Sequence, residues 1–104
     1  MKKEVNKEYT YPLEELIIAG SFNRYQVNVH NDDFTPMEFV VSVLELFFFM
    51  DRRKSADIMF KAHLTGKAVC GLFTKEVAES KVARVLEYIE MHEHPLIFSM
   101  EAMT

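Results

Sequence analysis

The order of short apolar segments along this 104-residue chain predicts a two-layer α+β sandwich, in which a small sheet is covered on one side by three helices. Three segments have the pattern of strands and three have the spacing of helices, in the order strand, helix, helix, strand, helix, strand. Three helices are too few to cover both faces of a sheet in a chain of this length, so we expect them to pack on one face.

The length and composition are those of one compact domain. Aliphatic, aromatic and sulfur-containing residues make up 49% of the chain and charged residues 27%, as in ordinary globular domains. Twelve Lys and Arg oppose sixteen Asp and Glu, which gives a formal charge of −4. This sign disfavours a nucleic-acid partner, because binding to phosphates requires excess positive charge.

The single cysteine, Cys70, has no partner for an internal disulfide. The apolar runs are shorter than the ~18 residues that span a bilayer, and none follows a basic start as in a signal peptide. We therefore expect a cytoplasmic protein that does not insert into a membrane.

The first 23 residues differ in character from the rest. Residues 1–23 mix both charge signs and contain one short apolar cluster, at residues 16–18, so we expect a flexible extension before a folded domain at residues 24–104. From Tyr25 onward, apolar and polar residues alternate as far as Asn31, which predicts a half-buried strand.

Capping residues predict where the helices begin and end. Thr35 is expected to cap a helix that begins at Pro36, with apolar positions continuing through residues 46–50, a run that requires unusually complete cover. Asp51 and Gly66 fit the start and the end of a second helix at residues 52–65.

The second half of the chain contains the remaining three elements. Residues 68–73 fit a second strand, and Thr74 is placed to cap a third helix. Pro95 separates this helix from a last strand predicted at residues 96–100.

The segment at residues 31–39 contains an amide and two carboxylates just before a helix, a group that favours a cation. Spacing alone favours a simpler interpretation, a capping loop with excess acid. His63 occupies a helix whose neighbouring positions are apolar, and the pattern alone favours a buried histidine over one that faces a pocket. The candidate walls of a cavity are Met37, Val40, Val43, Met59, Ala62 and Leu96. Such a pocket suits a large apolar side chain attached to a charged amine.

Four ordered motifs resemble the ClpS family, the adaptors that deliver N-end-rule substrates to the ClpA unfoldase and its ClpP peptidase. They are NDDFTPMEFV at 31–40, the segment at 59–63, GKAVCGLFTKEVAESKV at 66–82 and HEHPL at 92–96. The resemblance covers residues 24–101 and implies a three-stranded antiparallel sheet against three helices.

The resemblance also implies a function and its residues. Asn31, Asp32 and His63 are expected to hold the α-amino group of a substrate whose first residue is Leu, Phe, Tyr or Trp, with Met37 as a gate against β-branched residues. An ammonium group has three donors, which amide, carboxylate and imidazole acceptors satisfy. The full set expected around the amine and the first peptide unit is Asn31, Asp32, Asp33, Thr35 and His63.

A second surface is implied at residues 74–81, where the family docks on the N-terminal domain of the unfoldase. The resemblance assigns this contact to Glu76 and Lys81, whereas their pattern alone indicates only a solvated helix face. Adaptors of this kind need no dimer, so we expect a monomer.

Other classes of function find less support. An enzyme needs a nucleophile beside a base, and Cys70 lies in an apolar strand, as an inert buried thiol does. His92 and His94 lack a third ligand at metal-binding spacing, so no metal or other cofactor is expected. The remaining alternative is a general interaction domain that binds a partner helix through residues 47–50.

Overall fold

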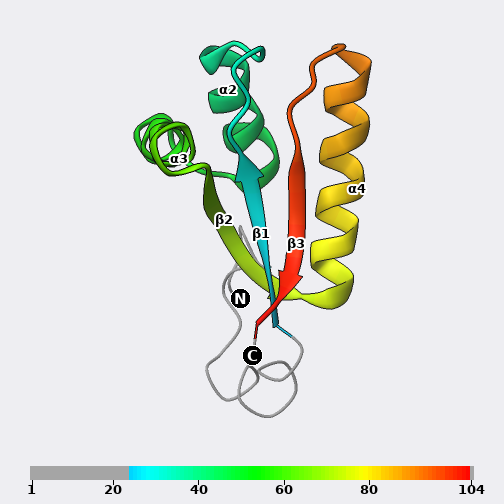
Figure 1. Cartoon of the computed structure of the whole chain (residues 1–104). Coiled ribbons are helices and arrows are strands. Elements are labelled where there is room, and N and C mark those ends of the chain that lie inside the picture. Colours follow the sequence, from blue (N-terminus) through cyan, green and yellow to red (C-terminus); the bar gives the residue numbers. More distant parts are fainter. Residues whose placement is uncertain (1–23, 104) are drawn as a thin grey trace.

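The computed structural model describes residues 24–103, so the extension predicted at residues 1–23 lies outside the described residues. Three strands and three helices follow one another in the predicted order (Figure 1). They are β1 (Arg24–His30), α2 (Met37–Phe48), α3 (Arg52–Thr65), β2 (Lys67–Thr74), α4 (Lys75–Met91) and β3 (Phe98–Ala102).

The sheet is antiparallel, with β1 at its centre and the strand order β2-β1-β3. Val29 of β1 lies opposite Ala68 of β2 on one side and Phe98 of β3 on the other. In Figure 1, α4 runs along the sheet beside β3, while α2 and α3 lie toward the end at which β1 finishes. The carboxyl end of β1 therefore meets two helices and the segment that leads into β3.

One face of the sheet forms the core. The side chains of Val27, Val29, Ala68, Cys70 and Phe98 alternate inward and are buried. On the opposite face, a 3.0 Å ion pair between Lys67 and Glu101 joins the two outer strands. The predicted one-sided packing of the helices is confirmed.

Most of the predicted helix caps are present. The Asp51 side chain accepts a hydrogen bond from the backbone N–H of Lys54 at 2.8 Å, and Thr74 accepts one from Val77 at 3.3 Å. Gly66 ends α3 with a φ of 102°, a conformation that favours glycine.

The first and second strands differ from their predicted bounds by one residue at each end, while the predicted cap of α2 and the predicted start of the last strand are wrong. Thr35 does not cap α2, because Pro36 occupies the cap position without a side-chain hydrogen bond and the Thr35 hydroxyl donates to Asp32 instead. The last strand begins at Phe98 rather than at Leu96, since Leu96 turns inward and lines a pocket.

The aromatic end of α2 is less covered than its sequence predicts. Phe49 has a φ of 56°, which ends the helix after Phe48. Phe48 points into the core, whereas Phe49 and Leu46 are 56% and 54% exposed. The prediction that this whole run is covered is therefore wrong. None of the helices in residues 24–103 has the length and hydropathy needed to cross a membrane.

Candidate functional site

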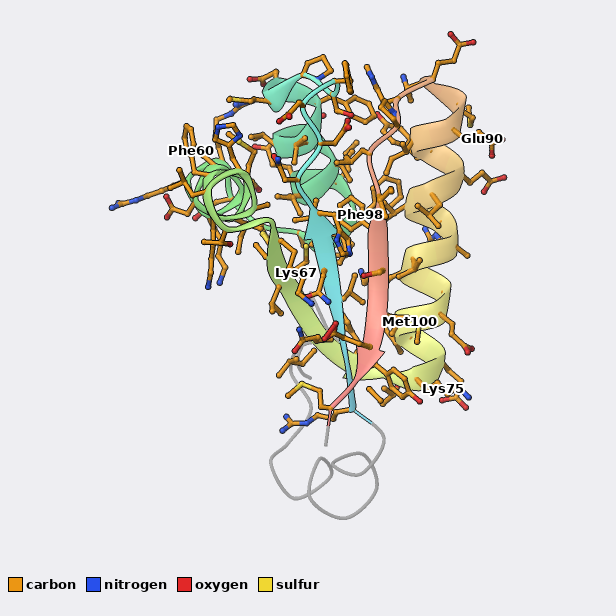
Figure 2. The ribbon with its side chains drawn as sticks, viewed as in Figure 1. Phe60, Lys67, Lys75, Glu90, Phe98 and Met100 are labelled. Carbon is orange, nitrogen blue, oxygen red and sulfur yellow. The ribbon has the colours of Figure 1, made fainter. Side chains whose placement is uncertain are left out.

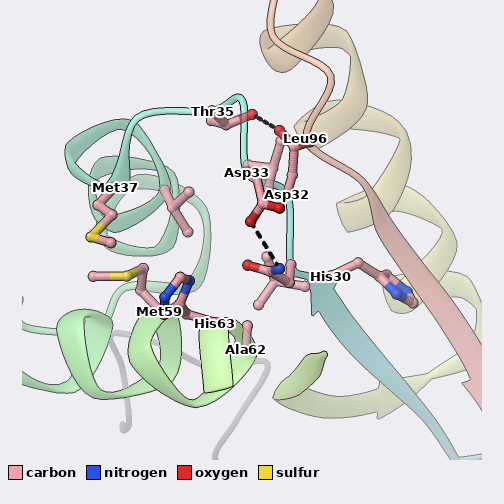
Figure 3. A pocket seen from close by; sticks show the side chains of 12 residues that line it. His30, Asp32, Asp33, Thr35, Met37, Met59, Ala62, His63 and Leu96 are labelled. Atoms are coloured by element: carbon pink, nitrogen blue, oxygen red, sulfur yellow. Dashed lines mark hydrogen bonds between the residues drawn. The ribbon is translucent and has the colours of Figure 1, made fainter. Parts of the chain in front are cut away.

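A pocket of about 170 Å³ opens where β1, the loop after it, α2, α3 and the segment before β3 meet (Figure 3). Its lining combines apolar walls with a polar end formed by the loop at residues 31–35. Three stretches that are distant in sequence, at residues 29–40, 59–63 and 96, contribute to it, so the pocket is a product of the tertiary fold.

Backbone hydrogen bonds hold the polar loop on both sides. The N–H of Asn31 donates to the carbonyl of Gly66 at the end of α3, at 2.8 Å. The N–H of His30 donates to the carbonyl of Ile97, at 3.0 Å. The loop is thus tied both to the helix that carries His63 and to the segment that carries Leu96.

Side-chain hydrogen bonds orient the polar groups themselves. The Asn31 Nδ2 donates to a carboxylate oxygen of Asp33 at 3.3 Å, which directs the Asn31 amide nitrogen toward the loop and leaves its oxygen to accept from a ligand. The buried Thr35 hydroxyl donates to Asp32. Both bonds are drawn in Figure 3.

The other end of the pocket is apolar. Met37 stands at the mouth, 47% exposed, and Figure 3 shows its side chain beside that of Met59. A methionine side chain is flexible, so Met37 forms an adaptable rim over the buried Met59. The buried residues that close the apolar end are Val29, Val40, Met59, Ala62 and Leu96.

The structure brings nearly all of the predicted site residues together. Those that line the pocket are Asn31, Asp32, Asp33, Thr35, Met37, Val40, Met59, Ala62, His63 and Leu96. Val43 does not line it, because Val43 lies one turn further along α2 and is completely buried in the core. The burial of His63 expected from its apolar neighbours is also wrong, since His63 is exposed at the pocket.

Two lining residues were not predicted, Val29 and His30. The alternation along β1 turns Val29 toward the helices, and this signal was present in the sequence. His30 follows it at the end of the strand, and its Nε2 lies 2.6 Å from the Ser99 hydroxyl. Figure 3 shows the His30 ring directed away from the other lining side chains.

The charge at the polar end is negative. Asp32 and Asp33 line the pocket, and no Lys or Arg of the described part of the chain lines it. An apolar cavity with carboxylate, amide and imidazole acceptors at its mouth suits a ligand that has a cationic head and an apolar body.

A larger cavity of about 580 Å³ lies between the end of α2 and α4. Glu76 and Lys81, the predicted docking residues, both line it. Glu76 is exposed, whereas the Lys81 ammonium donates to the carbonyl of Phe47 at 2.7 Å and lies 4.8 Å from the centre of the Phe49 ring. Lys81 therefore caps the end of α2 in addition to any role at the surface.

Cys70 is buried, and His92 and His94 near the C-terminus pack against an aromatic ring. Burial raises the pKa of Cys70 to about 12, against a smaller opposing effect from a backbone hydrogen bond at Val29, so the thiol is protonated at neutral pH. The rings of His92 and His94 pack against the Phe39 ring, with distances between ring centres of 5.5 and 4.2 Å. Within residues 24–103, no three His, Cys, Asp or Glu side chains are grouped as metal ligands.

Comparison with known families identifies the chain. Residues 21–99 match the family model described as the ATP-dependent Clp protease adaptor protein ClpS. This chain belongs to the ClpS family. Members of the family are adaptors of the Clp protease and not enzymes.

Two curated ClpS proteins are similar over most of their length. The ATP-dependent Clp protease adapter protein ClpS of Xylella fastidiosa (strain M12) is 53% identical over 78 residues, which are 75% of this chain and 74% of that protein. The ClpS of Vibrio cholerae serotype O1 (strain ATCC 39315) is 53% identical over 77 residues, 74% of this chain and 73% of that protein.

A solved ClpS structure has the same fold. The structure of Agrobacterium tumefaciens ClpS2 bound to L-phenylalaninamide superposes with a TM-score of 0.76 and 33% sequence identity. The match covers 79% of this chain and 99% of the other. The antiparallel sheet and the three helices are thus the ClpS fold.

Proposed function

We propose that this ClpS-family chain binds the free amino terminus of proteins whose first residue is Leu, Phe, Tyr or Trp, and delivers them to a ClpA-type unfoldase and its ClpP-type peptidase. The observation that carries the proposal is the pocket at the end of β1, which joins an apolar cavity to a cluster of acceptors. The likeness of the whole fold to the ClpS2 structure that holds L-phenylalaninamide supports a ligand with a free amine and an apolar side chain.

The polar end supplies acceptors for the substrate's α-ammonium group. The Asn31 amide oxygen, the Asp32 carboxylate and the His63 imidazole together match its three N–H donors. Thr35 positions Asp32 by donating to it, and Asp33 positions Asn31 by accepting from it. Hydrogen bonds to charged groups are stronger than neutral ones, so the ammonium group contributes much of the affinity.

The apolar end selects the first side chain by shape. Val40, Ala62 and Leu96 are buried and form walls against which a Leu or aromatic side chain can pack. Loss of one methylene from a ligand costs only about 1 to 3 kcal/mol, so rejection of β-branched residues requires a clash. Met37, at the mouth, is placed to provide it.

Delivery requires a second surface, which we assign to the start of α4. Glu76 is exposed there and lines the 580 Å³ cavity with Lys81, and both belong to α4, which contributes no residue to the lining of the amine pocket. The adaptor can therefore hold a substrate and the N-terminal domain of an unfoldase at once. We expect it to act as a monomer in the cytoplasm.

Reconstituted degradation tests the proposal. A reporter protein that begins with Phe is incubated with a ClpA-type unfoldase and ClpP, with and without this chain. We expect the chain to accelerate degradation of this reporter and not of one that begins with Ala, and Asp32→Asn to remove the effect. Equal degradation of both reporters would contradict the proposal.

The alternative, a domain that binds a partner helix, is favoured by one observation, the exposure of Leu46 and Phe49 beside the larger cavity. Such binding would not depend on a free amine in the ligand. The two functions therefore separate when free and acetylated peptides are compared.

A further inference from the structure

We infer that the amine pocket distinguishes the amino terminus of a peptide from a free amino acid, because its charges accept an ammonium group and disfavour the carboxylate that a free amino acid carries beside it. The inference rests on the proposed function, since it concerns the same pocket. It defines the ligand by two features: the amine must be free and the carboxyl group must be blocked.

The charges at the polar end carry the inference. Asp32 and Asp33 both line the pocket, and the lining that residues 24–103 provide contains neither Lys nor Arg to attract a carboxylate. His30 also lines it, but its ring is directed away, beside the Ser99 hydroxyl at 2.6 Å. Among the lining residues, His63 is then the one imidazole at the mouth.

The covalent geometry of a free amino acid brings its carboxyl group close to the negative charges of Asp32 and Asp33. The carboxyl carbon is separated from the amine nitrogen by the α-carbon alone, so a ligand whose ammonium lies between Asn31 and Asp32 holds its carboxyl group a few ångströms from the same acidic side chains. Repulsion between unit charges at such distances changes an affinity from a few-fold in water to far more near a protein surface. In a peptide, an amide or an ester, the same position is a neutral carbonyl.

Asp33 is held in place to take part in this repulsion. Its carboxylate accepts the 3.3 Å hydrogen bond from Asn31, so it remains beside the amide that receives the substrate amine. Asp33 is exposed and its charge does not have to be neutralised by a bound ammonium, whereas Asp32 is half-buried and accepts from Thr35. We assign Asp33 as a positioning residue for Asn31 that also excludes free amino acids.

This selectivity has a clear use in an adaptor. Free Leu, Phe, Tyr and Trp carry the same side chains as the proposed substrates and are present in every cell. A pocket that bound them as well as it binds a peptide would be occupied by them. Discrimination by charge keeps it open to proteins.

Competition with small ligands tests the inference. A labelled peptide that begins with Phe is displaced at pH 7 by L-phenylalaninamide, by L-phenylalanine methyl ester and by L-phenylalanine, with N-acetyl-phenylalaninamide as the negative control. We expect the amide and the ester to act at similar concentrations and the free amino acid to require about tenfold more or higher.

Two outcomes overturn the inference. Displacement by free phenylalanine as efficient as by the amide would mean that the pocket does not exclude the carboxylate, and would point to pairing with His63. An ester as weak as the free amino acid would mean that the amide N–H, and not the charge, is recognised. Failure of the labelled peptide itself to bind would instead refute the proposed function.

Matched charge variants locate the effect. Asp33→Asn retains an acceptor for Asn31 and removes one charge, so the ratio between free phenylalanine and the amide should fall several-fold. Glu90→Gln removes the same charge from the outer side of α4 (Figure 2) and should leave the ratio unchanged. An unchanged ratio in Asp33→Asn, in a variant that melts as the wild type does, would contradict the assignment of Asp33.

Discussion

The backbone N–H of Asn31 donates a 2.8 Å hydrogen bond to the carbonyl oxygen of Gly66. This bond joins the loop that carries the acidic side chains to the end of α3, one turn from His63. Gly66 in turn donates its own N–H to the carbonyl of Ala62 at 2.8 Å. Gly66, at the end of α3, therefore fixes the position of the loop with Asn31 and Asp32 relative to His63.

Gly66→Ala should destabilise the protein and weaken peptide binding. The φ of 102° at Gly66 is unfavourable for any residue with a Cβ, although no atom lies within 4 Å of the position that the Cβ would take. We expect the free energy of unfolding to fall by about 1 to 2 kcal/mol, which lowers Tm by several degrees in a domain of this size. Thermal denaturation measures it, and an unchanged Tm would show that the backbone relaxes without cost.

Met37→Ala should admit β-branched first residues. Met37 is 47% exposed at the mouth, so its truncation opens the entrance without leaving a cavity in the core. We expect affinity for a peptide that begins with Val to rise about tenfold, and affinity for one that begins with Phe to change only a few-fold. Titration of both peptides against both proteins measures the ratio. If the Val peptide gains no more than the Phe peptide, Met37 is not the gate.

Ala62→Val should reduce binding of the largest first residue most. Ala62 is buried in the apolar wall, and added methyl groups there occupy space that a bound ring would fill. An overfilled site costs about 1 to 3 kcal/mol, so we expect a loss of tenfold or more for Trp and a smaller loss for Leu. Equal losses for the two peptides, in a variant of unchanged Tm, would contradict this placement of Ala62.

The free energy of unfolding should fall at alkaline pH because of the buried Cys70 thiol. Its pKa is raised from 9.0 to about 12 by burial, so the folded protein keeps the thiol proton after the unfolded chain has lost it. The stabilisation from the protonated thiol is complete below about pH 9 and is lost as the pH rises toward 12, at about 1.4 kcal/mol per pH unit. Urea unfolding at several pH values measures this slope.

Cys70→Ala is the control for that measurement. The variant has no thiol to titrate, so the difference in unfolding free energy between wild type and variant should be constant below pH 9 and should shrink above it. A difference that stays constant up to pH 11 would mean that Cys70 titrates alike in the folded and unfolded states.

The sequence predicted the elements well because local signals specify them. Asp51, Gly66 and Thr74 mark helix ends by hydrogen bonds or backbone preferences within a few residues, and each acts as predicted. Thr35 has the same local pattern but bonds to Asp32 instead of to the helix. Local sequence could not decide between these two partners, because Asp32 and the first turn of the helix are both within a few residues of Thr35.

The candidate walls of the cavity were predicted from the apolar residues, whereas the roles of Asn31, Asp32 and His63 were predicted only from the family motifs. Periodicity placed His63 in the core, and the structure exposes it at a pocket whose other walls come from β1 and the segment before β3. Val43 shares a helix face with Val40 yet lies beyond the end of the pocket. Whether a residue on a helix face lines the pocket or lies in the core depends on where the neighbouring elements end. The sequence pattern along one helix gives no information on that position.

The most direct test of the central claim is the fluorescence anisotropy of a short labelled peptide that begins with Phe, compared with the same peptide after N-acetylation. Acetylation removes the charge and two of the donors that Asn31, Asp32 and His63 are proposed to bind, at a cost of roughly 2 to 5 kcal/mol. We predict binding of the free peptide and a loss of at least thirtyfold on acetylation. Equal binding of the two peptides, or no binding of either, would contradict the account.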